Sequence, residues 1–239
     1  MAAETATEPR RLRVPVAAIL LTALFVTALV TAQVISAKLL VLALPVLGAV
    51  TAPGGTLAYA VTFFASDCLS ELYGKRYTRA VVNVAFGMNF VLLALVWVTI
   101  GLPAARGSVD PDAFRTVLGL STNVVAGSLA AYVVSQNWDV IVFHRIREAT
   151  DGASLWLRNL GSTATSQLLD TVIFTVVAFL LAPAVGVGPS LPLGVVGSLI
   201  LGQYVLKLLI ALVDTPFVYA AVGAVRRRAA AGGPTTADS

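Results

Sequence analysis

The stretch RAVVNVAFGMNFVLLALVWVTIG, residues 79–101, carries no charged side chain after its first arginine. A helix needs about 20 mostly apolar residues to cross a hydrocarbon core of roughly 30 Å, so this stretch predicts a membrane-spanning helix. The rest of the chain is similar: its 239 residues are 58% hydrophobic and 12% charged, and the mean hydropathy is +0.89. Soluble domains carry about 25% charged residues. The composition therefore indicates an integral membrane protein.

Five further apolar segments flank this one. The six together cover about residues 14–37, 55–73, 79–101, 117–143, 160–182 and 192–224. The breaks after the first, third and fifth segments are short and contain Pro and Gly, as in ALPVLGAVTAPGG. We predict an all-α integral membrane fold, a six-helix transmembrane bundle over residues 14–225. An N-terminal segment, residues 1–13, precedes it, and a small, polar tail, residues 226–239, is expected to be disordered.

The positive charges predict the orientation, because Lys and Arg in short loops mark the cytoplasmic side. With the N-terminus inside, one side receives the basic clusters near residues 10–13, 75–79, 145–158 and 226–228. The other side receives only Arg106 and Arg115. Both termini are therefore expected in the cytoplasm and the chain in the cell membrane, surrounded by the lipid bilayer. Because the charges flank apolar segments, no nucleic-acid partner is expected.

The second segment ends in FFASDCLSELYGKR, residues 63–76, which places two carboxylates inside or beside a span. A centred Asp costs about 2.5 to 3.5 kcal/mol on insertion scales, so such residues usually face the bundle interior and mark a site. Four-residue spacing puts Asp67 and Glu71 on one helix face, with Phe63 a turn away. Glu71 could instead be an interfacial residue paired with Arg76. Asp67 lies deeper and is the stronger candidate.

An internal echo links the fourth and fifth segments, where SQNWDVIVF (residues 135–143) and SQLLDTVIF (residues 166–174) share SQxxDxxxF. Helical spacing places Gln136 with Asp139, and Gln167 with Asp170, on one face of each helix. The two spans should run antiparallel, which is compatible with an inverted repeat, although chance similarity is the alternative. In either case we expect these positions to line a shared cavity. Trp138 fits an interfacial belt or could stack on a ligand.

The last segment holds Gln203, Lys207 and Asp214, which helical spacing places on one stripe. A lone intramembrane lysine normally pairs with a carboxylate, so we expect Lys207 to pair with Asp170, Asp139 or Asp67. Such a pair could bind a ligand, or it could only fix the packing of the helices.

The motifs of common enzymes are missing from this sequence. One histidine and one cysteine cannot supply a HExxH-like or multi-cysteine metal site, and neither a GxSxG elbow nor a phosphate-binding glycine loop is present. We therefore expect no enzyme activity, no cofactor and no metal. Scattered carboxylates, amides and a lysine suit a carrier of a polar organic solute better than a channel filter. A membrane-embedded binding component with an external motor stays open, as does a non-transporting structural protein.

Four short motifs, in this order, resemble those of the queuosine-precursor transporter family, also called the VUT family. The resemblance covers about residues 16–224. The matching residues are Asp67, Glu71, Tyr73 and Gly74 in a D-x-x-x-E-x-Y-G element; Gln136, Asp139, Val140, Val142 and Phe143 in a Q-x-x-D-V-x-V-F element; Asp170 and Thr171; and Lys207.

The resemblance implies a six-span importer of 7-deazaguanine bases, 7-cyano- or 7-aminomethyl-7-deazaguanine, that are used to make queuosine in tRNA. It also implies a small purine-like substrate. A likeness in span number to substrate-binding components of energy-coupling-factor transporters leaves open an external energising partner or a homo-oligomer. The expected substrate-binding residues are Asp67, Glu71, Gln136, Asp139, Gln167, Asp170, Gln203 and Lys207, with Phe63 and Trp138 for stacking.

Overall fold

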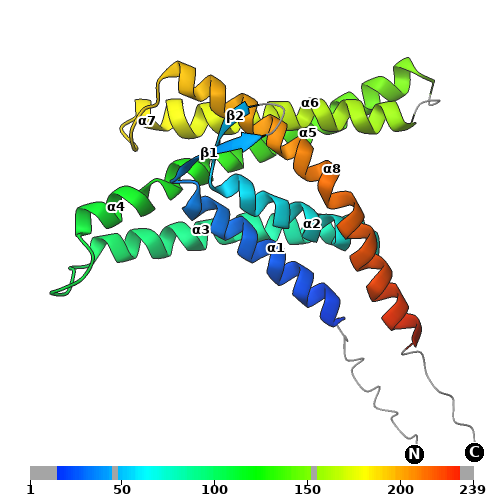
Figure 1. Ribbon diagram of the computed structural model, residues 1–239, viewed down its shortest axis with the longest axis horizontal. Coiled ribbons are helices and arrows are strands. Elements are labelled where there is room, and N and C mark those ends of the chain that lie inside the picture. Colours follow the sequence, from blue (N-terminus) through cyan, green and yellow to red (C-terminus); the bar gives the residue numbers. More distant parts are fainter. Residues whose placement is uncertain (1–14, 45–47, 152–154, 232–239) are drawn as a thin grey trace, which may run out of the picture.

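The computed structural model describes residues 15–44, 48–151 and 155–231 and shows a bundle of long helices (Figure 1). The elements in chain order are α1 (Val16–Ile35), β1 (Leu39–Leu44), β2 (Gly48–Pro53), α2 (Gly55–Tyr73), α3 (Lys75–Gly101), α4 (Pro111–Gly119), α5 (Ser121–Ala149), α6 (Leu155–Val176), the π-helical turn η1 (Val177–Leu181), α7 (Ala182–Ala184) and α8 (Leu193–Ala231). The predicted helical membrane bundle is confirmed.

Six long helices, α1, α2, α3, α5, α6 and α8, correspond to the six predicted segments. Among the described residues, five stretches are long and apolar enough to cross a membrane: Val16–Ile35, Lys75–Gly101, Pro111–Ala149, Leu160–Ala184 and Leu193–Arg228. The sixth helix, α2, has 19 residues, carries Asp67 and Glu71, and packs against α1, α3 and α8. Its polar residues lower its hydropathy, and the surrounding helices supply its apolar environment. The cytoplasmic position of the termini stays a prediction, which reporter fusions at each end would test.

Clusters of buried side chains hold the helices of the bundle together. Phe25 and Leu29 of α1, Ala65 and Leu69 of α2, and Ala85 of α3 form the first buried cluster. The antiparallel pair α5 and α6 forms the second and has the most extensive contact of any two elements (Figure 1).

A glycine sets the close approach of α5 and α6. A Cβ atom at Gly127 would lie 2.8 Å from the carbonyl oxygen of Phe174 and 3.0 Å from the Cβ of Ala178. Small residues allow backbones in membranes to approach closely, and the packing gained there replaces the hydrophobic driving force that lipid does not provide.

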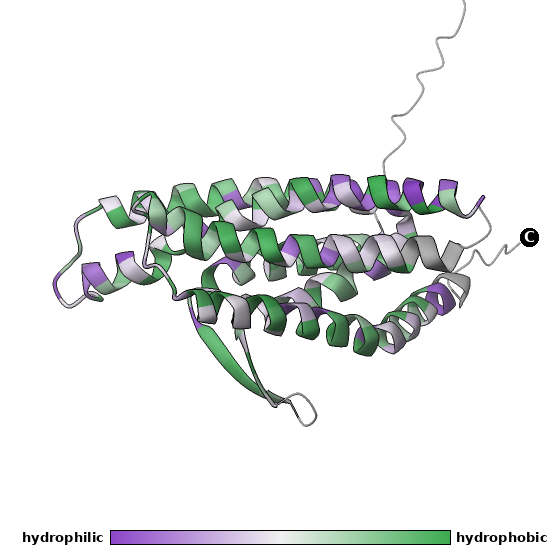
Figure 2. Cartoon of the chain, turned by 90° about the horizontal axis from the view of Figure 1, so that it is seen from above, coloured by the Kyte–Doolittle hydropathy of each residue, from purple (hydrophilic) through white to green (hydrophobic). Residues whose placement is uncertain are grey.

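The segment between α1 and α2 differs from the expected Pro/Gly break. Residues 39–44 and 48–53 form the two strands of an antiparallel hairpin, with Leu39 opposite Pro53 and Leu44 opposite Gly48. The sequence LLVLAL is apolar at every position, so it lacks the alternation by which a strand is usually recognised. Figure 2 shows the hairpin projecting on one side of the helices and coloured as hydrophobic along its strands.

Other boundaries also differ from the predicted ones. The fourth predicted segment, 117–143, begins inside a separate short helix, α4, and otherwise lies in the longer α5. Asp110 caps α4 by accepting a hydrogen bond of 3.0 Å from the Ala113 N–H. The last helix continues to Ala231, past the expected end at residue 224. η1 interrupts the end of α6 just before Pro183, whose ring cannot donate a helical hydrogen bond. The N-terminal segment 1–13 and residues 232–239 of the predicted tail lie outside the described residues.

Candidate functional site

A cavity of about 170 Å³ lies in the bundle, lined by residues of α1, α2, α3, α5, α6 and α8. It is smaller than the roughly 300 to 1,000 Å³ of pockets for drug-sized ligands, so it suits a single small molecule. Six aromatic side chains line it: Phe25, Tyr59, Phe63, Phe86, Tyr132 and Phe174. Its polar lining includes one carboxylate, one amine and three primary amides, which come from α5, α6 and α8.

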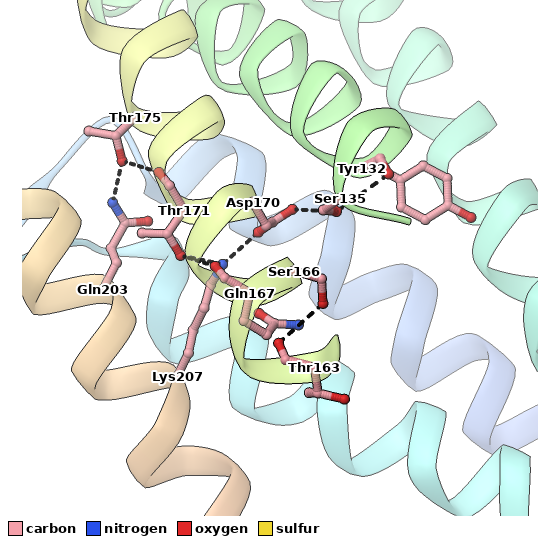
Figure 3. Close-up of polar contacts among 10 residues, drawn as sticks. All are labelled: Tyr132, Ser135, Thr163, Ser166, Gln167, Asp170, Thr171, Thr175, Gln203 and Lys207. Carbon is pink, nitrogen blue, oxygen red and sulfur yellow. Dashed lines mark hydrogen bonds and ion pairs between the residues drawn. The ribbon is translucent and has the colours of Figure 1, made fainter. Parts of the chain in front are cut away.

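The ion pair of Lys207 and Asp170 is the charged centre of the cavity (Figure 3). Lys207 Nζ donates to Asp170 Oδ2 at 2.6 Å and to Thr171 Oγ1 at 3.2 Å. The lysine side chain is 7% exposed and the aspartate side chain 27%, so the carboxylate keeps an open side toward the cavity. The expected pairing of Lys207 with a carboxylate is confirmed, and among the three candidates the partner is Asp170.

Hydrogen bonds hold this pair in position from both helices. Gln203 Nε2, one turn before Lys207, donates to Thr175 Oγ1 at 3.0 Å, and Thr175 in turn donates to the Thr171 carbonyl at 2.7 Å (Figure 3). Ser135 Oγ approaches the other carboxylate oxygen, Asp170 Oδ1, at 3.4 Å. This distance is long for an O–H···O bond, so Oδ1 is the less firmly held oxygen.

Aromatic rings form the walls around the polar centre. Phe86 and Tyr132 stack with centroids 4.2 Å apart and planes inclined by 26°. Tyr132 donates its hydroxyl to Asn83 Oδ1 at 2.8 Å, which fixes that ring against α3. Lys207 Nζ lies 5.7 Å from the centroid of the Tyr59 ring, within the range of a cation–π contact. Flat apolar faces next to a donor and an acceptor suit a planar heterocycle.

The structure brings six of the ten expected site residues to this cavity. They are Phe63, Gln136, Gln167, Asp170, Gln203 and Lys207. The remaining four, Asp67, Glu71, Asp139 and Trp138, lie elsewhere.

Asp67 and Glu71 do share one face of α2, but that face turns toward the end of α8 rather than toward the cavity. Both line a separate pocket together with Arg226. Glu71 Oε2 lies 3.7 Å from Arg226 Nη2, with both side chains more than half exposed, and Arg226 also donates to the Glu71 carbonyl at 3.1 Å. The cation beside Glu71 therefore comes from α8 and is Arg226, whereas the sequence suggested Arg76.

Asp139 takes part in a reciprocal arrangement with the second copy of the echo. Ser166 Oγ donates to Asp139 Oδ1 at 3.2 Å, as Ser135 of the first copy does to Asp170 of the second. Each serine thus contacts the aspartate of the other copy, as expected for two antiparallel copies of one motif. Only Asp170 reaches the cavity, because Lys207 of α8 packs beside that half. Trp138 is 42% exposed on the outer side of α5.

Several polar groups in or beside the cavity were not among the expected site residues. Gln33 of α1 lies behind the cavity-lining Ser128: it is fully buried, and its Oε1 accepts a hydrogen bond of 3.3 Å from Ser128 Oγ. The signal that marked Gln203, an amide inside a span, applies equally to Gln33. Tyr59 and Tyr132 carried no such signal, because tyrosines in spans are common near membrane interfaces. No three His, Cys, Asp or Glu side chains meet as metal ligands would within the part of the chain that the structure describes.

Comparisons with known proteins agree with this membrane architecture. Residues 53–221 match the family described as "Putative vitamin uptake transporter". The chain is 37% identical, over 176 residues and 73% of each chain, to the "Probable queuosine precursor transporter" of Bacillus subtilis (strain 168). It is 27% identical, over 143 residues and 58% of each chain, to the "Probable queuosine precursor transporter" of Haemophilus influenzae (strain ATCC 51907 / DSM 11121 / KW20 / Rd). No solved structure matches it significantly. The chain, a multi-pass membrane protein, therefore belongs to the family described as "Putative vitamin uptake transporter".

Proposed function

We propose that this protein imports a 7-deazaguanine base, 7-cyano- or 7-aminomethyl-7-deazaguanine, for the salvage of queuosine precursors in tRNA modification. The observation that carries the proposal is the Lys207–Asp170 pair, which opens into an aromatic cavity of about 170 Å³. The names of the two relatives support the same substrate class.

The hydrogen-bonding edge of a 7-deazaguanine complements this pair. Along that edge the base presents a carbonyl acceptor, a ring N–H donor and an amino donor in sequence. Lys207 offers a donor beside the two acceptor oxygens of Asp170, and a carboxylate can accept two parallel N–H bonds at once. An adenine-like edge lacks this order of groups. The weakly held Asp170 Oδ1 is the oxygen that the substrate would take over from Ser135.

The remaining lining fits the rest of the base. Gln136 and Gln167 each carry both a donor and an acceptor and come from the two copies of the repeated motif. Phe63 and the stacked pair of Phe86 and Tyr132 offer flat faces for the bicyclic ring. We assign substrate binding to these residues together with Gln203, whose hydrogen bond to Thr175 helps to hold Thr171 beside Lys207.

Uptake of labelled 7-cyano-7-deazaguanine by cells that cannot synthesise it tests the proposal. The double variant Asp170→Asn/Lys207→Gln keeps the cavity neutral while it removes both charges. Hydrogen bonds to charged groups contribute about 1.5 to 3 kcal/mol, so apparent affinity should fall by about 10- to 150-fold. Asp139→Asn is the matched control, since Asp139 holds the same position of the repeated motif outside the cavity.

Near-normal uptake by the double variant, at matched membrane levels, would contradict the assignment of the site. Equal losses in the double variant and in Asp139→Asn would also contradict it. If the ion pair only fixes helix packing, no deazaguanine should stabilise the purified protein against heat. A thermal-shift series with deazaguanines separates that alternative from transport.

A further inference from the structure

A second, smaller cavity lies next to the central one, and we call it the outer chamber. It measures about 80 Å³ and is lined by the end of α1, the start of β1, the start of α5, η1 and the loop between α7 and α8. Figure 1 shows α4 and α7 at the end of the bundle opposite the start of α1 and the end of α8. The charge pattern predicts that this end faces away from the cytoplasm.

The outer chamber and the central cavity follow each other along the same helices and share no lining residue. On α5, Ser128 lines the central cavity, and Val124, one turn before it, lines the outer chamber. Phe174 of α6 and Ala178 of η1 are related in the same way. A partition about one helical turn thick, roughly 6 Å, therefore separates the two.

Packed apolar side chains fill this partition. Val124, Phe174 and Ala178 belong to one buried cluster. The Phe179 ring, which lines the outer chamber, packs edge-on against the Phe174 ring, which lines the central cavity, with centroids 6.0 Å apart and planes inclined by 87°. The backbones of α5 and α6 also approach closely here, at Gly127. A solute can pass from one cavity to the other only if the partition moves.

The backbone beneath Phe179 departs from regular helix. Phe179 lies on η1, where the Ala182 N–H donates to the carbonyl of Val177, five residues before it. Pro183, four residues after Phe179, has no N–H to donate to the carbonyl of that residue. The turn that carries Phe179 therefore has fewer α-helical hydrogen bonds than a regular turn, and π-helical turns are frequent at functional sites.

A buried amide holds the loop that closes the outer chamber. Asn123 of α5 is 2% exposed, and its Nδ2 donates to the Val187 carbonyl at 2.6 Å. Pro189 and Leu191 of the same loop line the chamber. The loop approaches α5 closely, since a Cβ atom at Gly188, whose φ of +79° favours glycine, would lie 2.8 Å from Asn123 Nδ2. The hydrogen bond of Asn123 thus ties the loop to α5.

Two buried amide groups at this level have no hydrogen-bond partner within the part of the chain that the structure describes. They are Asn123 Oδ1, an acceptor, and Gln33 Nε2, a donor. Gln33 is fully buried on α1 between Leu29, which lines the central cavity, and Ser36, which lines the outer chamber. Leaving a buried polar group unpaired is unfavourable, whereas a nucleobase offers both N–H and carbonyl groups. The two amides therefore suit a polar solute in passage.

We propose that the solute enters the central cavity through the outer chamber, and that Phe179 and Asn123 form the gate between them. Phe179 seals the partition against Phe174. Asn123 holds the closing loop and offers its unpaired oxygen to the solute, and Gln33 offers an N–H further along the route. The identity of the solute as a planar base rests on the proposed function, whereas the position of the gate does not.

Cysteine labelling of the full-length protein tests the gate without any substrate. The chain has one cysteine, Cys68, which is buried, so Cys68→Ala provides a background without other thiols. In that background Ser128→Cys places a thiol at the central cavity. A small membrane-impermeant methanethiosulfonate is added either to intact cells or to inverted membrane vesicles. The rate of modification reports access to the cavity from each side.

Opening the gate should speed labelling from outside the cell. Asn123→Ala removes one hydrogen bond, so the rate in intact cells should rise about 2- to 12-fold. Phe179→Ala removes the aromatic seal and should raise the rate at least about tenfold. Phe179→Leu keeps an apolar side chain and should restore most of the seal. The rate in inverted vesicles should not rise in any of these variants.

Two control variants match the gate variants in chemistry and location. Phe114→Ala removes a phenylalanine of α4 that lies outside the partition. Asn137→Ala removes an amide of α5 that donates to the Val133 carbonyl of its own helix. Neither should change the labelling rate. An unchanged rate in either gate variant, an equal rise in the controls, or a rise confined to inverted vesicles would overturn the gate.

Binding measurements separate the gate from the substrate site. Phe179→Ala should keep the affinity of the purified protein for 7-cyano-7-deazaguanine, because Phe179 does not line the central cavity. A loss of affinity with unchanged labelling would place Phe179 in the site instead and overturn the gate. If the wild-type protein binds no deazaguanine, the proposed substrate fails, and the labelling rates still decide whether the gate exists.

Discussion

Asp170 has two carboxylate oxygens with unequal partners, and this asymmetry suits it to the substrate-binding role that we propose. Oδ2 is held by Lys207 at 2.6 Å, whereas Oδ1 has only the 3.4 Å approach of Ser135. A substrate donor can therefore replace a weak contact without breaking the ion pair. The lysine in turn remains available to a substrate carbonyl, because its amine has three donors.

Breaking the ion pair from one side should be costly for folding. Lys207→Met leaves the Asp170 carboxylate without its cation, and removal of one partner of a buried pair costs about 3 to 5 kcal/mol. Because the Asp170 side chain is 27% exposed, we expect the lower end, about 3 kcal/mol, or about 6 to 12 °C in the unfolding temperature. Asp170→Asn/Lys207→Met should recover most of this loss. Thermal unfolding of the purified variants measures both, and a double variant as unstable as the single one would contradict the pairing.

Single residues also show how far sequence reasoning reaches. Polar groups inside apolar segments stand out, which is why Lys207, Asp170 and Gln203 could be predicted. The direction in which a helix face turns depends on its neighbours, so spacing alone could not predict that Asp67 and Glu71 lie outside this cavity. Gln33 is an amide inside an apolar segment, like Gln203, so the same signal could have identified it. Tyr59 and Tyr132 carry no such signal in the sequence.

The α5–α6 pair shows how two helices build one half of the site. The reciprocal contacts of Ser135 with Asp170 and of Ser166 with Asp139 fix the axial register of the two helices. That register places Gln136 and Gln167 in the same cavity. The repeated motif in the sequence predicted a shared cavity. That each serine contacts the aspartate of the other copy became evident only from the antiparallel packing of the two helices.

Gly127 should be a sensitive position in this pair. A Cβ there meets the Phe174 carbonyl oxygen at 2.8 Å, and overpacking costs about 1 to 3 kcal/mol. The better helix propensity of Ala offsets about 0.5 to 1 kcal/mol of that. Gly127→Ala should therefore lower the stability of the purified protein by about 1 to 2 kcal/mol in thermal unfolding.

Gly87→Ala on α3 is the control for this change, because a Cβ at Gly87 meets nothing within 4 Å. It should be neutral or slightly stabilising. If Gly127→Ala and Gly87→Ala change the stability equally, Gly127 is not there to allow close packing of α5 on α6.

The hairpin, by contrast, could not be predicted from the sequence, because a uniformly apolar strand has no alternating pattern to detect.

At the scale of the whole molecule, the bundle combines apolar outer surfaces with a polar cavity among its helices. Trp97, Phe90 and Leu95 of α3 are exposed to the surroundings, while the charged pair and the amides of α6 and α8 lie inside. The number of helices followed from segment length and hydropathy, because the bilayer sets both. The hairpin between α1 and α2 could not be predicted in this way, since its position depends on contacts with α8, which is distant in the sequence.

This arrangement offers a solute a cavity of defined polarity, lined by six helices. A cavity that requires a donor beside two acceptors selects ligands by the order of groups on one edge. The central proposal is therefore about recognition: we propose that the chain binds a 7-deazaguanine through its guanine-like edge, with Asp170 accepting from the ring N–H and the amino group.

Calorimetric titration of the purified protein in lipid nanodiscs tests this claim most directly. The ligands are 7-cyano-7-deazaguanine and the same base without its 2-amino group. We predict one bound base per chain and an affinity at least about tenfold weaker for the analogue, because it loses one hydrogen bond to a charged acceptor. Equal affinities for the two bases, or no binding of 7-cyano-7-deazaguanine by the wild-type protein, would contradict the account.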